Sequence, residues 1–176
     1  LVLGMTGGDL INFVKQARGQ GLTEQVDIVN NTITQLLIRQ ALGEDTYETY
    51  GAMRYLYTLD SSSNDRFVED FEAEHGSIPD TFAGVNYLSI QMTAQGIQEA
   101  GTADPTEVKD VLPGLEMADT IVGPTYFREC DHQAVYDVWV SKNVAPESGT
   151  VADIEVLSEV DGETAIYPCG DANCTQ

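Results

Sequence analysis

The residues in this sequence that most resemble catalytic machinery are Asp131-His132-Gln133, where a histidine stands beside a carboxylate. A histidine in such a setting can act as a general base. Neighbouring residues on an extended strand point to opposite faces, however, so we do not expect Asp131 to orient His132. The sequence also has no G-x-S-x-G pattern of a serine nucleophile. We therefore predict no catalytic residue, and a structural hydrogen-bonding role for His132.

The cysteines Cys130, Cys169 and Cys174 are a second place where chemistry could occur. In an oxidising compartment Cys169 and Cys174 could close a small disulfide loop, or one of them could pair with Cys130. Three free thiols are the alternative. A metal site needs more ligands than the well-separated His75 and His132 can add, and there is no C-x-x-C motif. We take Cys169 and Cys174 as the candidate disulfide and predict no metal and no cofactor.

Two polar loops follow the apolar segments 1–5 and 26–29, which have the composition of short parallel strands. Ligands of open α/β sheets bind at the carboxyl ends of such strands. The first loop precedes a predicted helix whose free N–H groups could face a carboxylate or carbonyl oxygen. The second loop offers amide and hydroxyl groups. Helix capping, by Asp9 in the first loop, is the alternative explanation, and capping and ligand contact can coexist. The candidate ligand-binding residues are Met5, Thr6, Gly7, Asp9, Asn30, Asn31 and Thr32.

Hydrophobic periodicity and turn residues predict the elements that must position these loops. We expect helices over residues 9–20, 33–42, 66–75, 80–100 and 104–112. We expect strands over 1–5, 26–29, 53–59, 120–122, 135–140 and 151–160. The alternation of strand and helix in the first fifty residues predicts a parallel sheet with helices on its faces.

The charge of the chain is extreme: 29 Asp and Glu against 8 Lys and Arg give a net charge of −21 over 176 residues. The acidic residues are interleaved with apolar runs, so the sequence predicts a folded protein with an anionic surface. At molar salt the Debye length falls to ~3 Å and self-repulsion is largely screened. We therefore favour a protein from an extreme halophile, the alternative being a mildly acidic secreted protein.

The same charge excludes several partners. An anionic surface repels phosphate backbones, and the few arginines form no basic stripe, so we predict no nucleic-acid binding.

No run of 18 apolar residues is present that could span a bilayer. The chain opens in an apolar segment without an initiator methionine, and we expect it to be the C-terminal piece of something longer.

Several segments, taken in order over residues 1–142, resemble the Leu/Ile/Val-binding family of ABC transporter solute-binding proteins. The segments are Gly7-Gly8-Asp9-Leu10 with Phe13-Val14-Lys15-Gln16-Ala17-Arg18 and Gly21-Leu22, Phe67-Val68, Gly76, Pro79, Tyr87, Glu99-Ala100-Gly101, Asp104-Pro105 and Val108, and Val122-Gly123-Pro124 with Phe127-Arg128 and Asp131-His132-Gln133. The resemblance implies an α/β protein of the type I periplasmic-binding fold, with two lobes of which this chain is about the second half.

The resemblance also implies a division of the chain. Residues 1–52 would complete the second lobe, and 53–130 would hold a crossing strand and the helices of the first lobe. Residues 131–176 would return strands to the second lobe and end in the cysteine-containing tail. We expect an extracytoplasmic protein that captures a small polar solute by lobe closure and docks on an ABC permease, with a lipid anchor in a part that precedes this sequence. The alternative is a ligand-sensing regulatory domain on the same fold.

The expected solute class depends on one departure from the family. The best-known amino acid binders of the family have a glutamate near the end of the second strand that pairs with the ligand's amino group. Asn31 and Thr32 occupy the nearest positions here, and both are neutral. Neither can form a charge-assisted bond to an ammonium, although Asp9 could. Short amides and urea therefore stand beside branched-chain amino acids as expected solutes.

Overall fold

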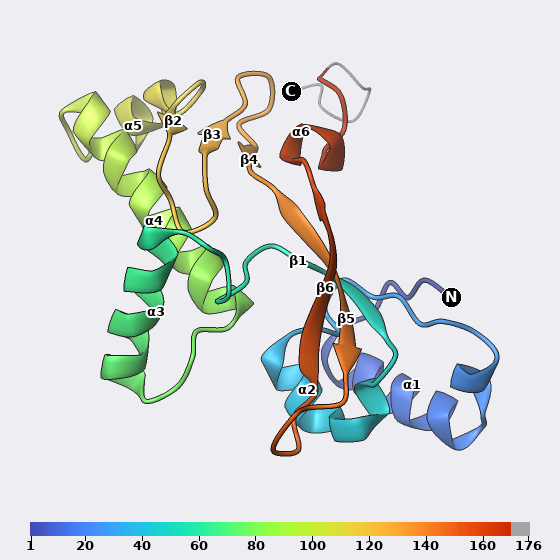
Figure 1. Ribbon diagram of the computed structural model, residues 1–176. Helices are drawn as coiled ribbons and strands as arrows, with labels where there is room; N and C mark the ends of the chain where they lie inside the picture. Colours follow the sequence, from blue (N-terminus) through green and yellow to red (C-terminus); the bar gives the residue numbers. More distant parts are fainter. Residues whose placement is uncertain (170–176) are drawn as a thin grey trace. The chain divides into compact units, whose positions relative to one another are not determined.

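The computed structural model describes residues 1–169, and the chain divides into two compact units (Figure 1). Unit 1 comprises Leu1–Arg54 and Trp139–Glu159, and unit 2 comprises Tyr55–Val138 and the residues from Val160 onward. The chain therefore passes between the units three times. The predicted segment 1–52 falls within unit 1, whereas the predicted segment 131–176 is divided, since only Trp139–Glu159 belongs to unit 1. The assignment of the units to particular lobes stays a prediction.

Unit 1 contains the helices α1 (Gly7–Gly19) and α2 (Leu36–Leu42) with the short 3-10 turns η1 (Leu22–Glu24) and η2 (Gly43–Thr46). The predicted helix 9–20 is confirmed, with its start at Gly7. The predicted helix 33–42 is shorter than expected because residues 31–34 form a turn. The apolar positions of both helices pack with those of the two preceding extended segments in one core, made of Leu3, Leu10, Val14, Ala17, Ile28, Ile33, Ile38 and Leu42.

The sheet of unit 1 contains β1 (Tyr50–Met53), β5 (Val138–Val144) and β6 (Asp153–Val160), in the order β1-β5-β6. β1 pairs antiparallel with β5, and Tyr50 lies opposite Lys142. On the other side of β1 the first extended segments of the chain pair in parallel, through the bridges Val2–Val29 and Val29–Tyr50. The parallel arrangement predicted for the start of the chain is therefore present, as bridges rather than as full strands.

Unit 2 is built on α3 (Ser62–His75), α4 (Thr81–Ala100) and α5 (Pro105–Val111), all of which the sequence predicts. Each begins at a capping residue whose side chain accepts a hydrogen bond from the first turn: Ser61, Asp80 and Asp104. α3 and α4 end at glycines in the left-handed conformation, Gly76 and Gly101. Local sequence signals thus fix both ends of these two helices.

An aromatic cluster joins α3 to α4. The Phe67 ring stacks on Tyr87 with centroids 4.3 Å apart, and meets the edge of Tyr55 at 5.9 Å. α4 presents Gly84 to the Tyr55 ring, where an added Cβ would lie 2.2 Å from a ring carbon. Tyr55 is fully buried and its hydroxyl donates to Asn64 Oδ1 at 2.9 Å. This burial raises the pKa of Tyr55.

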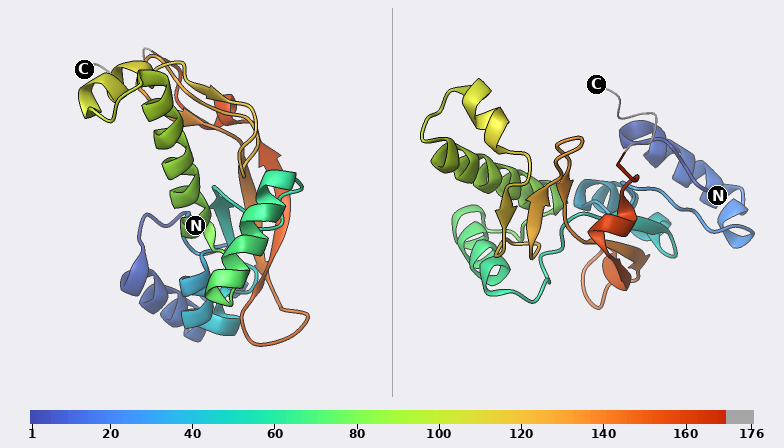
Figure 2. Two further views of the ribbon diagram at one scale, coloured as in Figure 1. Left: turned by 90° about the vertical axis from the view of Figure 1, so that its left-hand side faces the viewer. Right: turned by 90° about the horizontal axis from the view of Figure 1, so that it is seen from above.

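The remaining elements of unit 2 are short: β2 (Glu116–Met117), β3 (Thr125–Phe127), β4 (Ala134–Val135) and α6 (Gly162–Ala165) (Figure 2). Three strand predictions need correction. The strand expected over 53–59 ends at Met53, since Tyr55 and Leu56 turn into the core of unit 2. The segment 120–122 is a turn held by the Thr120 hydroxyl, which donates to Gly123 O at 2.6 Å. The segment 135–140 is divided between β4 and β5. Among residues 1–169, no helix is long and apolar enough to cross a membrane.

Candidate functional site

The two predicted ligand loops lie together in unit 1, and one side chain joins them. Asn30 is 1% exposed, and its amide nitrogen donates to Leu3 O and to Met5 O, both at 2.8 Å. Its Oδ1 accepts from Thr32 N at 2.8 Å and from the Thr32 hydroxyl at 2.9 Å. The end of the first extended segment is thus bonded to the end of the second.

These bonds use the whole hydrogen-bonding capacity of the Asn30 side chain, which is two N–H donors and two acceptor positions on oxygen. Asn30 therefore positions the two loops, a role that differs from the predicted ligand contact. It does not cap a helix either, because α2 begins only at Leu36.

The hydroxyl groups of the two loops lie side by side as a result. Thr6 Oγ1 is 3.4 Å from Thr32 Oγ1, and Thr6 is exposed while Thr32 is half-buried. Thr6 is the N-cap residue of α1, but its side chain accepts no hydrogen bond from the helix. The predicted cap, Asp9, instead lies in the first turn of the helix and is exposed. The helix start is therefore not closed by a capping side chain.

The other predicted residues surround this point. Gly7 opens α1 with φ of +59°, a conformation that glycine adopts without strain. Gly7 and Asn31 are exposed, and Met5 is half-buried. Asp9 is the single carboxylate among the seven predicted residues. Hydroxyl groups, an amide and a helix start together suit an oxygen-bearing solute, either neutral or anionic.

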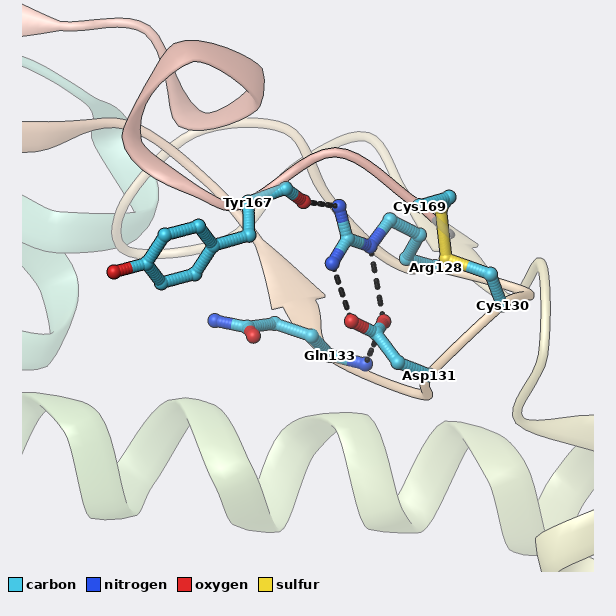
Figure 3. Close-up of a disulfide and its surroundings, with 6 residues drawn as sticks. All are labelled: Arg128, Cys130, Asp131, Gln133, Tyr167 and Cys169. Atoms are coloured by element: carbon cyan, nitrogen blue, oxygen red, sulfur yellow. Dashed lines mark hydrogen bonds and ion pairs between the residues drawn. A yellow bond between two sulfur atoms is a disulfide. The ribbon is translucent and has the colours of Figure 1, made fainter. Parts of the chain in front are cut away.

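The Asp131-His132-Gln133 stretch forms a turn between β3 and β4, not the extended strand that we assumed (Figure 3). His132 has φ of +59°. The Asp131 carboxylate is paired with the Arg128 guanidinium, where Nε lies 2.9 Å from Oδ1, and it accepts from Gln133 N at 3.2 Å. Asp131 therefore fixes the position of the Arg128 side chain and stabilises the turn to which it belongs.

The disulfide prediction needs correction. Cys169 is bonded to Cys130, 39 positions away, and not to Cys174 (Figure 3). Cys174 lies outside the described residues. Among residues 1–169, no group of three or more His, Cys, Asp or Glu side chains is placed to hold a metal ion.

Sequence reasoning missed a role shared by three arginines, each of which donates to a backbone carbonyl group at least 27 positions away in the chain. Arg18 donates to Asp45 O at 3.0 Å and to Tyr47 O, and Arg39 donates to Thr34 O at 3.0 Å and to Ala152 O. Arg128 donates to Tyr167 O at 2.5 Å. The one available signal was Arg39, which occupies a buried position of its helix next to Ile38.

Comparison with known proteins relates the chain to one family. A model of the family described as periplasmic binding protein matches residues 1–148. Among solved structures, the chain is similar to an amino acid ABC transporter substrate-binding protein from Pseudomonas fluorescens Pf-5, with 22% identity and a TM-score of 0.83. That similarity covers 100% of this chain and 47% of the other.

Two further solved structures share the fold. One is the leucine-, isoleucine-, valine-, threonine- and alanine-binding protein from Brucella ovis in a closed conformation, with 18% identity, a TM-score of 0.82, and 96% and 44% of the two chains covered. The other is a solute binding protein of an ABC transporter from Rhodopseudomonas palustris BisB5 in complex with 3,4-dihydroxybenzoic acid. It has 18% identity, a TM-score of 0.74, and 99% and 46% of the chains covered. This chain thus spans less than half the length of the solved structures that it matches.

Proposed function

Since this chain belongs to the periplasmic binding protein family and has its type I fold, we propose that it forms part of the extracytoplasmic solute-binding component of an ABC importer. Members of this family bind a substrate for transport and do not transform it. In this proposal unit 1 belongs to the second lobe and unit 2 to the first. Closure of the lobes captures the solute, and the loaded protein docks on a membrane permease.

The observation that carries this proposal is the joining of the two loops by Asn30. A buried side chain with four hydrogen bonds within the protein fixes both loop backbones before any solute arrives. Preorganised groups lose little conformational freedom on binding, which favours affinity. The fixed loops present the hydroxyl groups of Thr6 and Thr32 beside the open start of α1.

The proposed solute is a small polar molecule with a carboxylate or amide oxygen, such as a branched-chain amino acid, a short amide or urea. The positive end of the α1 dipole and its N–H groups would receive that oxygen. The neutral Asn31 and Thr32 give no partner for an ammonium group, and Asp9 is the one residue of the seven that could supply one. The names of the matched structures, which include amino acid binders and a complex with 3,4-dihydroxybenzoic acid, are compatible with a solute oxygen at this position.

Calorimetric titration of the complete natural protein tests this proposal. We would use salt of roughly 2–3 M, where the Debye length is at most about 3 Å and self-repulsion is screened. The panel contains L-leucine, L-valine, L-alanine, acetamide, urea and 3,4-dihydroxybenzoate. Binding of one class in the micromolar range or tighter would support solute capture, and would name the class. A folded protein that binds no member of the panel would contradict the proposed solute class and favour a sensor of another ligand.

A further inference from the structure

The three passages between the units leave neighbouring strands of the unit 1 sheet, since Met53 at the end of β1 pairs with Trp139 in β5. The chain leaves unit 2 after Val138, in β5, and returns after Glu159, in β6. β5 and β6 are neighbours in the sheet of unit 1. The remaining passage, after Arg54, follows β1.

On the unit 1 side, a side-chain hydrogen bond joins the residue that follows the second passage to the residue that precedes the third. Trp139 is the first residue of unit 1 after the second passage, and Glu159 is the last before the third. Trp139 is 5% exposed, and its Nε1 donates to Glu159 Oε2 at 3.3 Å. Trp139 is also the one tryptophan of the chain.

On the unit 2 side, the two passages are in backbone contact. Gly162 N donates to Asp137 Oδ1 at 2.9 Å. A Cβ added to Gly162 would lie 2.6 Å from the Tyr136 carbonyl oxygen, so the two backbones approach too closely for any side chain at this position.

Further along unit 2, the same two segments are joined twice more (Figure 3). Arg128 donates to Tyr167 O at 2.5 Å, and Cys130 is bonded to Cys169. From the Trp139–Glu159 pair to Asp137–Gly162 and on to Cys130–Cys169, the partners separate in sequence by nearly equal steps, as in an antiparallel ribbon. The disulfide is the covalent end of that ribbon.

We propose that the exposed Cys130–Cys169 disulfide is a positioning device for the passages between the units, because it keeps residues 136–139 paired with residues 159–162. Two passages would then move as one ribbon, beside the passage after Arg54, whose strand β1 pairs with β5. With the disulfide intact, Asp137 and Gly162 lie in a short closed segment between it and the β5–β6 pairing, so their contact is favoured by a high effective concentration. Without it, one end of the ribbon is held by non-covalent bonds alone. The link from this ribbon to solute capture rests on the function proposed above.

Hydrogen exchange in the complete natural protein tests this inference without a solute. All variants carry Cys174→Ser so that no third thiol can re-pair, and Cys174→Ser alone is the matched control. In the Cys130→Ser/Cys169→Ser variant we expect the Gly162 amide to exchange at least about tenfold faster, equivalent to 1.4 kcal/mol of lost protection. We also expect the Trp139 indole N–H to exchange faster and the Trp139 fluorescence to change.

The location of Trp139 makes this result specific. Trp139 belongs to unit 1 and the disulfide to unit 2, so a disulfide that merely stabilised unit 2 would leave Trp139 unchanged. Faster exchange across α4 with no change at Trp139 would overturn the inference. Unchanged exchange at both Gly162 and Trp139 would overturn it as well. The amides of Leu10 and Val14 in α1 serve as internal controls and should not change.

The rate at which L-leucine dissociates provides a second test of the inference. If L-leucine binds, we expect its off-rate to rise about tenfold in the variant without the disulfide, since most affinity changes appear in the off-rate. If L-leucine does not bind the control, the amino acid form of the proposed function fails, and the exchange experiment still decides on the ribbon. If exchange shows an intact ribbon in the variant while L-leucine binds, the inference fails and the proposed function stands.

Discussion

Asn30 in unit 1 and Arg128 in unit 2 each join two segments that are remote in sequence, but by different chemistry. Each is almost fully buried, at 1% and 8% exposure, and each donates to backbone carbonyl groups of a segment remote in sequence. Asn30 is neutral and depends on four hydrogen bonds. Arg128 is charged, is paired with Asp131, and lies two residues from a disulfide that joins the same two segments.

The difference shows where this acidic protein uses its few positive charges. Arg18, Arg39 and Arg128 are three of the five arginines, and all bind backbone carbonyl groups. Guanidinium groups used in this way are not available to form a basic surface. The two loops of the candidate site are instead joined by a neutral amide, whose hydrogen bonds do not depend on ionic screening.

The disulfide should give the largest effect in this comparison. It closes a loop of 39 positions, so the Cys130→Ser/Cys169→Ser variant should lose about 4 kcal/mol of unfolding free energy by loop-closure entropy. Urea denaturation followed on unit 2 aromatic signals measures this loss. Cys174→Ser should be within about 0.5 kcal/mol of the parent. A loss below about 1 kcal/mol for the double variant would show that Arg128 alone holds the two segments.

Removal of the Asn30 side chain should have the second largest effect on stability. Asn30→Ala leaves the carbonyl groups of Leu3 and Met5 without their donor inside unit 1, and we expect a loss of about 3 kcal/mol. Asn30→Asp is the matched variant of equal shape. It keeps the acceptor for Thr32 but places a second oxygen against the two carbonyl groups, so it should be at least as destabilising. Denaturation at about 0.2 M and 3 M salt should give the same loss for Asn30→Ala, because no charge is removed.

How much of this could be predicted from the sequence depends on whether the signal is local. Caps, glycine C-termini and apolar periodicity predicted α3, α4 and α5, since each signal lies within a few residues of the element that it fixes. The strand expected over 53–59 failed because its aromatic residues serve tertiary packing: Tyr55 is buried against Gly84. Aromatic composition alone does not separate these two uses.

The candidate site shows the same limit. That the two loops lie together followed from the parallel pairing of the segments before them. The inward role of Asn30 could not be predicted, because its partners are the backbone carbonyl groups of Leu3 and Met5, which leave no trace in side-chain sequence. The disulfide was assigned to near neighbours in sequence, whereas the turn after β3 and the segment after α6 bring Cys130 to Cys169.

Removal of the Arg128 side chain should have a smaller effect on stability than removal of Asn30. The Cys130–Cys169 disulfide still holds the segment that contains Tyr167. Arg128→Met loses the bond to Tyr167 O and the pair with Asp131, and we expect about 2 kcal/mol of lost stability. Unlike the Asn30→Ala loss, part of this loss should disappear at molar salt, because the Asp131 side chain is 16% exposed. The same denaturation series measures it. If Arg128→Met lost the same stability at both salt concentrations, the proposed difference in salt dependence between Arg128 and Asn30 would be wrong.

The surface pair of unit 1 should give the smallest effect, visible only at high pH. The Lys142 ammonium lies 2.6 Å from a Glu48 carboxylate oxygen, and this hydrogen bond raises the pKa of Lys142 above its ordinary 10.5. The folded protein therefore holds this proton more tightly than the unfolded chain. The stabilisation is complete below pH 10.5 and is lost as the pH rises through the raised pKa. Lys142→Met should remove this alkaline loss, which a comparison of urea midpoints across that pH window detects. Identical alkaline curves for variant and parent would contradict the pairing.

Titration of the complete natural protein carrying Thr6→Val and Thr32→Val tests directly whether the loops joined by Asn30 hold a solute oxygen. Thr93→Val, on the exposed surface of α4, is the matched control. With the solute identified by the panel, we predict that the double variant binds at least about tenfold more weakly while the control binds as the parent does. Unchanged affinity in a folded double variant would contradict the claim and place the solute elsewhere.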